Sequence, residues 1–157
     1  MKQKRVADSI SIQTHMLRCE DINGVNRLFG GALLSWIDEV ASTVGRRHCQ
    51  TFVTSAAIDN LSFLGPAHLD DLVSVEGRAT YVGNTSMEVR VDVYEENYDL
   101  SRRLINRSYF TIVALDKDGM PIPIQYGLLL ETEEEKEEWD NALKRIEYRK
   151  LRKREGF

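Results

Sequence analysis

An α+β fold is predicted for this chain of 157 residues: an antiparallel sheet of about five strands around one central helix, followed by a C-terminal helix. Three features predict it. An apolar-rich helical pattern follows Gly30 and Gly31 and ends at Gly45; one strand-like segment precedes it and four follow it; and residues 131–155 form a separate, highly charged helical pattern. A helix that is apolar over most of its surface must be covered, and a sheet that curls around it provides the cover.

Composition predicts a single domain over residues 1–157, with its core in residues 8–123. The hydrophobic content of 42% suits one sizeable core. A net charge of -4 gives no global basic field for nucleic acid. No apolar run approaches the ~20 residues of a membrane span, and the N-terminus lacks an apolar signal region. Cys19 and Cys49 form no metal or redox motif. We therefore expect a cytoplasmic protein that binds neither nucleic acid nor membrane.

The strands are predicted from alternation and from the turns between them. Residues 9–17 alternate apolar and polar side chains, as in a half-buried strand. Residues 52–64 alternate less regularly and stop at a Gly-Pro pair. Residues 72–82, 85–95 and 103–115 follow in sequence, and short turns join them, which predicts antiparallel neighbours.

The C-terminal segment, residues 131–155, is predicted to be a helix with a defined start. Thr132 and Glu135 form a capping-box pattern. Acidic residues gather at the beginning and basic residues at the end, which matches the helix dipole. The basic end could bind phosphate or RNA, but a solvated terminal helix with pairs of opposite charge is the favoured interpretation.

The chemistry in this sequence centres on the loop before the central helix. No serine-hydrolase elbow, zinc-protease motif or nucleotide-binding loop is present, and we expect no metal. The glycines Gly30 and Gly31 open a helix whose unpaired N–H groups could hold a developing oxyanion. Asp38, at the edge of the apolar sector, could act as base or nucleophile, and Asn23 could orient water or a carbonyl. These residues could equally have structural roles: Asn23 as a loop former, the two glycines for close packing, and Asp38 as a polar residue at the edge of the apolar sector.

At these residues the sequence resembles the hotdog-fold acyl-CoA thioesterases, in the branch of the bacterial and brain-type acyl-CoA hydrolases. The resemblance runs from about Ile12 to Pro123, and its most specific part is the spacing of Asn23 and Asp38 around Phe-Gly-Gly. The matching positions are Asn23, Phe29, Gly30, Gly31, Leu34, Trp36, Asp38, Arg47, His48, Val53, Thr54, Phe63, Pro66, Asp71, Val73, Thr85, Ser86 and Val89. Two residues depart from the family, because Asn26 and Asp70 stand where it has glycine. Both types tolerate the glycine-like turn conformation, so we expect the loops to form.

The resemblance implies an active site shared between two protomers. Two sheets are expected to join in a homodimer, and three dimers to form a hexamer. Asp38 is then the general base or the nucleophile, and Asn23 of one chain faces Asp38 of the other. The Gly31 N–H would polarise the thioester carbonyl, and Thr54 is a weaker candidate at the same site. No cofactor is expected beyond the CoA of the substrate.

CoA is expected to bind near Gly30 and around the turn at residues 83–86. The candidate residues for its binding are Gly30, Gly83, Asn84, Thr85, Ser86, Arg47, Arg90 and Arg107. The function implied is hydrolysis of acyl-CoA to a carboxylic acid and CoA. The alternatives are a non-catalytic acyl-CoA binder or sensor, a hotdog hydratase and a structural oligomer. The hydratase is disfavoured because no histidine lies between Asn23 and Gly45.

Overall fold

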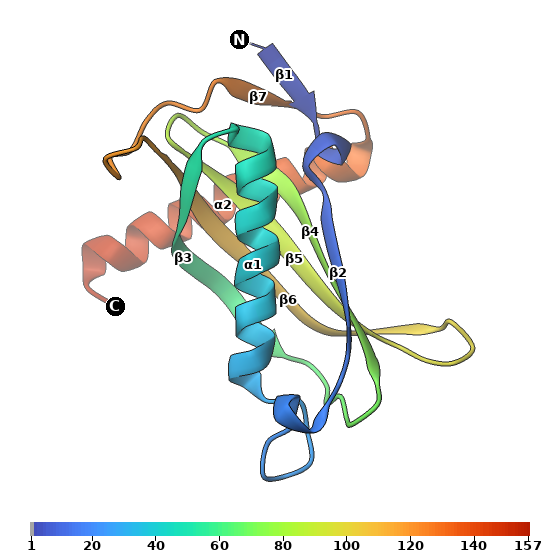
Figure 1. Ribbon diagram of the computed structural model, residues 1–157. Helices are drawn as coiled ribbons and strands as arrows, with labels where there is room; N and C mark the ends of the chain where they lie inside the picture. The colour runs from blue at the N-terminus through green and yellow to red at the C-terminus, as the bar shows by residue number, and fades with distance from the viewer. Residues whose placement is uncertain (1) are drawn as a thin grey trace.

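A central helix lies against one face of an antiparallel sheet, and a C-terminal helix crosses the other face (Figure 1). This computed structural model describes residues 2–157. The elements in chain order are β1 (Lys2–Arg5), the 3-10 helix η1 (Val6–Ser9), β2 (Ser11–Met16), the 3-10 helix η2 (Cys19–Asp21), α1 (Gly30–Cys49), β3 (Phe52–Phe63), β4 (Leu72–Val82), β5 (Ser86–Glu96), β6 (Arg102–Leu115), β7 (Tyr126–Leu129) and α2 (Glu133–Glu155).

The main sheet has five strands in the order β2-β4-β5-β6-β3, and each neighbouring pair is antiparallel. The predicted fold class is therefore confirmed. Strands β2 and β3 form the two edges, so within residues 2–157 one side of β3 has no partner strand. A second, two-stranded sheet, in which β1 pairs in parallel with β7, was not anticipated from the sequence.

Helix α1 packs closely on the sheet through an apolar face. Leu33, Ile37 and Val44 on this face are buried. A methyl group on Gly45 would lie 2.6 Å from a methyl carbon of Ile112, so only glycine allows this approach. The prediction that the helix ends at Gly45 was wrong, because this glycine serves packing. The helix continues to Cys49, where Gln50 takes the left-handed conformation, with φ 57°, and closes it.

Strand β2 is half-buried, as predicted, but its polar side faces inward. Ser11 is buried, and the ring of His15 stacks on Trp36 of α1 with 4.0 Å between centroids. The apolar side is open: Ile12 is 59% exposed and Met16 is 64% exposed. Exposed apolar side chains along an edge strand are typical of a surface that another protein covers.

Helix α2 is held to the outer face of the sheet by ion pairs. The guanidinium of Arg145 lies 2.7 Å from the Glu88 carboxylate of β5, and that of Arg149 lies 2.8 Å from Asp59 of β3. Both acidic side chains are buried. The predicted capping box is confirmed, with the Glu135 N–H donating to Thr132 Oγ1 at 3.1 Å. The solvated-helix interpretation was wrong for this face, because the basic residues neutralise buried carboxylates of the sheet.

The two loops that depart from the family pattern form with the backbone expected of glycine. Asn26 has φ 59° and Asp70 has φ 68°, both in the left-handed region. Asparagine and aspartate are among the side chains that tolerate it best. Among the described residues, no helix is both long and apolar enough to cross a membrane.

Candidate active site

Asp38 lies on α1 and turns its carboxylate toward strand β3. The side chain is half-buried, and its Oδ1 accepts a hydrogen bond of 2.5 Å from Ser55 Oγ. Such a short O–H···O⁻ contact is in the range of charge-assisted bonds. Within residues 2–157, Oδ2 has no hydrogen-bond partner. One oxygen is therefore fixed, and the other remains available to take a proton or attack a carbonyl.

Ser55 is a site residue that the sequence did not reveal. It lies next to Thr54 on β3, and successive side chains of a strand point to opposite faces. The candidate Thr54 is exposed, whereas Ser55 is half-buried and bonded to Asp38. A serine in an irregular strand carries no distinct signal, so only the packing of α1 on β3 identifies it.

The first turn of α1 presents backbone N–H groups without a side-chain cap. Phe29 stands at the N-cap position and provides no capping hydrogen bond, and the first bond of the helix joins the Leu33 N–H to the Phe29 carbonyl. The N–H groups of Gly30 and Gly31 precede that bond and have no acceptor within the helix. A side chain at Gly31 would collide with the Phe29 ring, at 2.6 Å from the nearest carbon. This turn can therefore donate to an anionic or carbonyl oxygen.

Asn23 organises the loop before α1 and keeps one functional group free. Its Oδ1 accepts from the N–H groups of Val25 at 3.0 Å and Arg27 at 3.1 Å. These two donors fix which end of the amide is oxygen. The Nδ2 group makes no hydrogen bond to another residue among those described. Asn23 can therefore donate a hydrogen bond through Nδ2 to a carbonyl oxygen or to a water molecule, but its amide cannot act as a base.

A pocket of about 500 Å³ joins this loop to the helix start. Asn23 and Gly30 line it together with Phe63, Pro66 and Ile105. Asp38 does not line it, and at 1.5 Å of rise per residue lies about 12 Å farther along the helix axis than Gly30. The described chain thus places Asn23 near the helix start but does not bring it into contact with Asp38.

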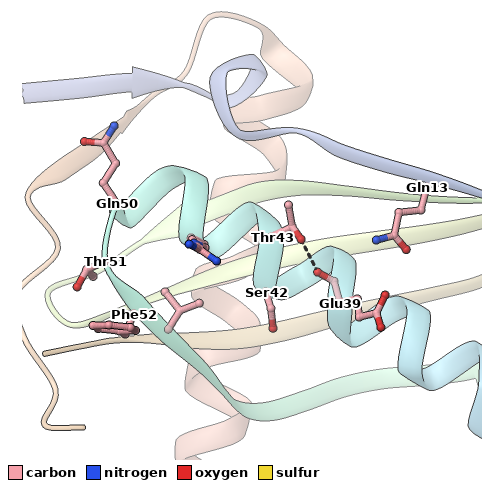
Figure 2. A pocket seen from close by; sticks show the side chains of 9 residues that line it. Gln13, Glu39, Ser42, Thr43, Gln50, Thr51 and Phe52 are labelled. Carbon is pink, nitrogen blue, oxygen red and sulfur yellow. Dashed lines mark hydrogen bonds between the residues drawn. The ribbon is translucent and has the colours of Figure 1, made fainter. Parts of the chain in front are cut away.

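A larger pocket of about 930 Å³ lies beside the solvent face of α1, next to the beginning of β3 (Figure 2). Its labelled residues include Glu39, Ser42 and Thr43 of the helix and Phe52 of the strand, and the dashed line marks Thr43 Oγ1 donating to the Glu39 carbonyl at 2.8 Å. Phe52 is 66% exposed. Gln13 of β2 also lines this pocket, which therefore extends over the solvent face of α1 from β2 to the beginning of β3. Asp38 is adjacent in sequence to its residue Glu39.

The turn expected to bind CoA lies between β4 and β5, away from both pockets. Gly83, Asn84, Thr85 and Ser86 line a recess of about 350 Å³ together with residues of α2, among them Lys150. The sequence suggested this turn as a CoA-binding segment, but it did not show that α2 lies beside the turn. The proximity of α2 depends on ion pairs between segments far apart in the chain.

The three arginines suggested for CoA binding are all engaged with other groups. Arg90 is buried and bonds Asp92 at 2.6 Å, and Arg107 bonds the same carboxylate at 2.6 Å. Burial alone would raise the pKa of Asp92, but these two arginines hold it below its usual value. The Arg47 guanidinium donates to the Ile10 carbonyl. The geometry gives Arg90 and Arg107 a structural task, which argues against their binding CoA.

Known proteins with the same architecture share this chain's sequence pattern. The Thioesterase superfamily model matches residues 26–101. The chain is 42% identical over 135 residues to the uncharacterized acyl-CoA thioester hydrolase YkhA of Bacillus subtilis, covering 85% of this chain and 78% of that protein. It spans only 36% of the longer rat cytosolic acyl coenzyme A thioester hydrolase, to which it is 31% identical.

Solved structures agree with this match over nearly the whole chain. A hexameric acyl-CoA thioesterase in its apo form superposes with a TM-score of 0.92 at 37% identity, covering 97% of each chain. The acyl-CoA hydrolase of Staphylococcus aureus, in complex with butyryl-CoA, CoA and CoA disulfide, superposes with a TM-score of 0.92 at 32% identity, covering 98% of this chain and 94% of that one. This chain therefore belongs to the acyl-CoA thioester hydrolases of the thioesterase superfamily.

Proposed function

We propose that this protein hydrolyses acyl-CoA thioesters with Asp38 as its general base or nucleophile. The observation that carries the proposal is the Asp38 carboxylate, with Oδ1 held by Ser55 and Oδ2 free of partners among the described residues. In the general-base route, Oδ2 takes a proton from water as the water oxygen bonds to the acyl carbon. In the nucleophilic route, Oδ2 itself bonds to the acyl carbon, and water then cleaves the anhydride. Either way the C–S bond breaks and CoA leaves as its thiol.

The N-terminal turn of α1 supplies the electrostatic part of this mechanism. Negative charge builds on the thioester oxygen as the acyl carbon becomes tetrahedral. The Gly31 N–H and the dipole of α1 would stabilise that charge, and the Asn23 amide would donate to the same oxygen or hold the water. Gly30 leaves room for the substrate at the mouth of the pocket it shares with Asn23.

Variants of the Staphylococcus aureus enzyme support these assignments. Solved structures include forms in which one aspartate, one asparagine or one threonine is replaced by alanine. The asparagine and aspartate have the same separation in that chain as Asn23 and Asp38 have here. The threonine follows that aspartate at the same distance at which Ser55 follows Asp38. This spacing favours Ser55 over Thr54 as the hydroxyl of the site.

Two observations support a site completed by a second copy of the chain. Asn23 and Asp38 are not in contact within one protomer, and the outer edge of β3 has no partner strand within residues 2–157. The exposed apolar residues of β2, at the other edge of the sheet, are available for contacts between dimers. A strand edge without a partner favours pairing with another strand. We propose a dimer in which β3 pairs with β3 of its partner. A trimer of such dimers would match the hexameric thioesterase that this chain resembles.

Release of free thiol from a series of acyl-CoA esters, C2 to C18, tests the activity. We expect hydrolysis with a preferred chain length, and no release without enzyme. Direct binding of the same esters separates the alternative: binding without hydrolysis would indicate an acyl-CoA sensor. Absence of both binding and hydrolysis would contradict the proposed function and leave only the fold.

A further inference from the structure

Arg27 lies in the loop before α1 and is tied to Asn23 by two hydrogen bonds. The Arg27 N–H donates to Asn23 Oδ1 at 3.1 Å, and the Arg27 carbonyl oxygen accepts from the Asn23 N–H at 2.8 Å. The two residues therefore stand side by side where the loop closes. Both also line the pocket of about 500 Å³ at the start of α1. A contact that holds Arg27 in place will also hold Asn23 in place.

The Arg27 guanidinium has no charged partner within residues 2–157. The side chain is exposed, and it forms neither an ion pair nor a hydrogen bond with any of these residues. All the other residues that line its pocket are uncharged. The guanidinium is therefore available to a carboxylate of another chain, which it could bind through a charge-assisted hydrogen bond.

Glu39 directly follows Asp38 on α1 and is an exposed carboxylate. It lines the pocket of about 930 Å³, and Figure 2 shows its side chain projecting from the helix. Arg46 lines the same pocket, but it lies roughly two turns, or about 10 Å, farther along the helix and forms no ion pair with Glu39. The charge of Glu39 also acts on His15, but burial lowers the pKa of His15 and keeps it neutral at pH 7. Within residues 2–157, no cation pairs with Glu39.

The proposed shared site would bring these two charges together. In that site Asn23 of one chain faces Asp38 of its partner. Arg27 adjoins Asn23 across the loop, and Glu39 adjoins Asp38 along the helix, where consecutive Cα atoms are about 3.8 Å apart. Each side of the contact thus combines one residue of the site with one unpaired charge, and the two charges are opposite. Two-fold symmetry would form the same contact twice in each dimer.

We infer that Arg27 of one chain pairs with Glu39 of its partner and thereby holds the Asn23 loop over the partner's Asp38. This inference rests on the proposed function, because it requires a site shared between two chains. Arg27 and Glu39 are positioning residues: neither reacts with the substrate, and each acts through the neighbour that does. Close charge pairs of this kind fix the register of an interface, and like charges in their place are strongly unfavourable.

Reversing the charge at either position tests the pair. Arg27→Glu would place two carboxylates opposite each other, and Glu39→Arg would place two guanidinium groups there. We expect each change to lower kcat/KM by about tenfold or more, because repulsion displaces Asn23 from the partner's Asp38. The double variant Arg27→Glu/Glu39→Arg restores opposite charges, so it should return to within about threefold of the wild type.

Arg154→Glu and Glu137→Arg are the matched controls for these reversals. Both residues are exposed on α2, which lies on the face of the sheet opposite α1 (Figure 1). Neither forms an ion pair with any of residues 2–157, and the two substitutions change the net charge by the same amounts as the test variants. Each control should keep kcat/KM within about twofold of the wild type.

Mixing Arg27→Glu with Glu39→Arg shows whether the pair joins two chains. In a mixed dimer one site would contain the wild-type pair and the other the reversed pair, so both sites would have opposite charges. Neither homodimer has this property. Mixed dimers should therefore regain activity close to that of the wild type, and they should exceed the half expected for random exchange. Native mass spectrometry of differently tagged chains measures the mixed fraction without any turnover.

Wild-type kinetics in either single variant, or a double variant no more active than the single ones, would overturn the inference. Recovery in the double variant without recovery on mixing would place the pair within one chain and would overturn it as well. A mixed fraction of one half after complete exchange would also contradict it. If the protein hydrolyses no thioester, the mixed fraction still tests the pair, so the proposed function and this inference can fail separately.

Discussion

Asp38→Asn is expected to lower kcat by about 100-fold or more with little change in KM. Asparagine has nearly the same shape, and its amide oxygen can still accept the hydrogen bond that Ser55 gives to Oδ1. It cannot take a proton from water or form an acyl anhydride. Steady-state kinetics on the best acyl-CoA of the series, with thermal unfolding to show that the fold is retained, measures the effect.

Variants of Ser55 provide smaller changes at the same site for comparison with Asp38→Asn. Ser55→Ala removes the donor to Oδ1 but leaves the carboxylate, so we expect a smaller fall in kcat than for Asp38→Asn. Ser55→Thr keeps the hydroxyl and should retain most of the activity. A decrease of only a few-fold in Asp38→Asn would show that Asp38 is neither base nor nucleophile. Asp38 would then be a polar residue at the edge of α1.

Asn23→Asp is expected to lower kcat by about 10- to 100-fold while the loop remains folded. The aspartate retains the oxygen that accepts from Val25 and Arg27. It loses the Nδ2 donor and places a negative charge where negative charge develops in the reaction. Asn23→Ala loses both the donor and the loop contacts, so it should lower kcat and the unfolding temperature together.

The two Asn23 variants separate a catalytic task from a structural one. If Asn23 only shapes the loop, Asn23→Asp should behave like the wild type and Asn23→Ala should be less stable. If it donates to the substrate or water, both variants should be slow, and only Asn23→Ala should unfold at lower temperature. Wild-type turnover in Asn23→Asp would therefore contradict the role proposed here.

The fold could be predicted from the sequence wherever periodicity and turn residues agree. Strand β4 (Leu72–Val82) has the predicted bounds, and α2 begins at the predicted Thr132 cap. The end of α1 was mispredicted because glycine is a common helix stop, whereas Gly45 is there for contact with Ile112. The pairing of β1 with β7 was missed because these two strands are short and far apart in sequence.

The polar faces of the sheet were the least predictable feature. Glu88, Arg90 and Asp92 alternate with valines, and charged residues in such a pattern are normally exposed to solvent. They are buried here because each has an opposite charge beside it. Arg145 of α2 meets Glu88, Glu138 of α2 meets Arg90, and Arg90 and Arg107 both meet Asp92. Charge partners that lie more than 40 residues apart cannot be identified from one sequence. The sequence also could not show that Arg90 and Arg107 are occupied, because the pairing of Arg107 with Asp92 depends on the register between β5 and β6.

The candidate site was predicted in part. Asn23, Gly31 and Asp38 stand out because glycines and polar residues border an otherwise apolar helix, and the structure gives each a free donor or acceptor. Ser55 could not be found without the contact between α1 and β3. The position of Asn23 relative to the site of a partner chain depends on how two chains assemble. The sequence of a single chain does not show that assembly.

Mixing Asn23→Asp with Asp38→Asn most directly tests whether these two residues act together from opposite chains. After subunit exchange of equal amounts, half of the dimers should be mixed, and each mixed dimer should contain one intact site. Activity should therefore rise to about a quarter of the wild-type value, from two proteins that are each nearly inactive. Differently tagged subunits that co-purify would verify the exchange. No recovery after verified exchange would place Asn23 and Asp38 in the site of a single protomer and contradict the shared site.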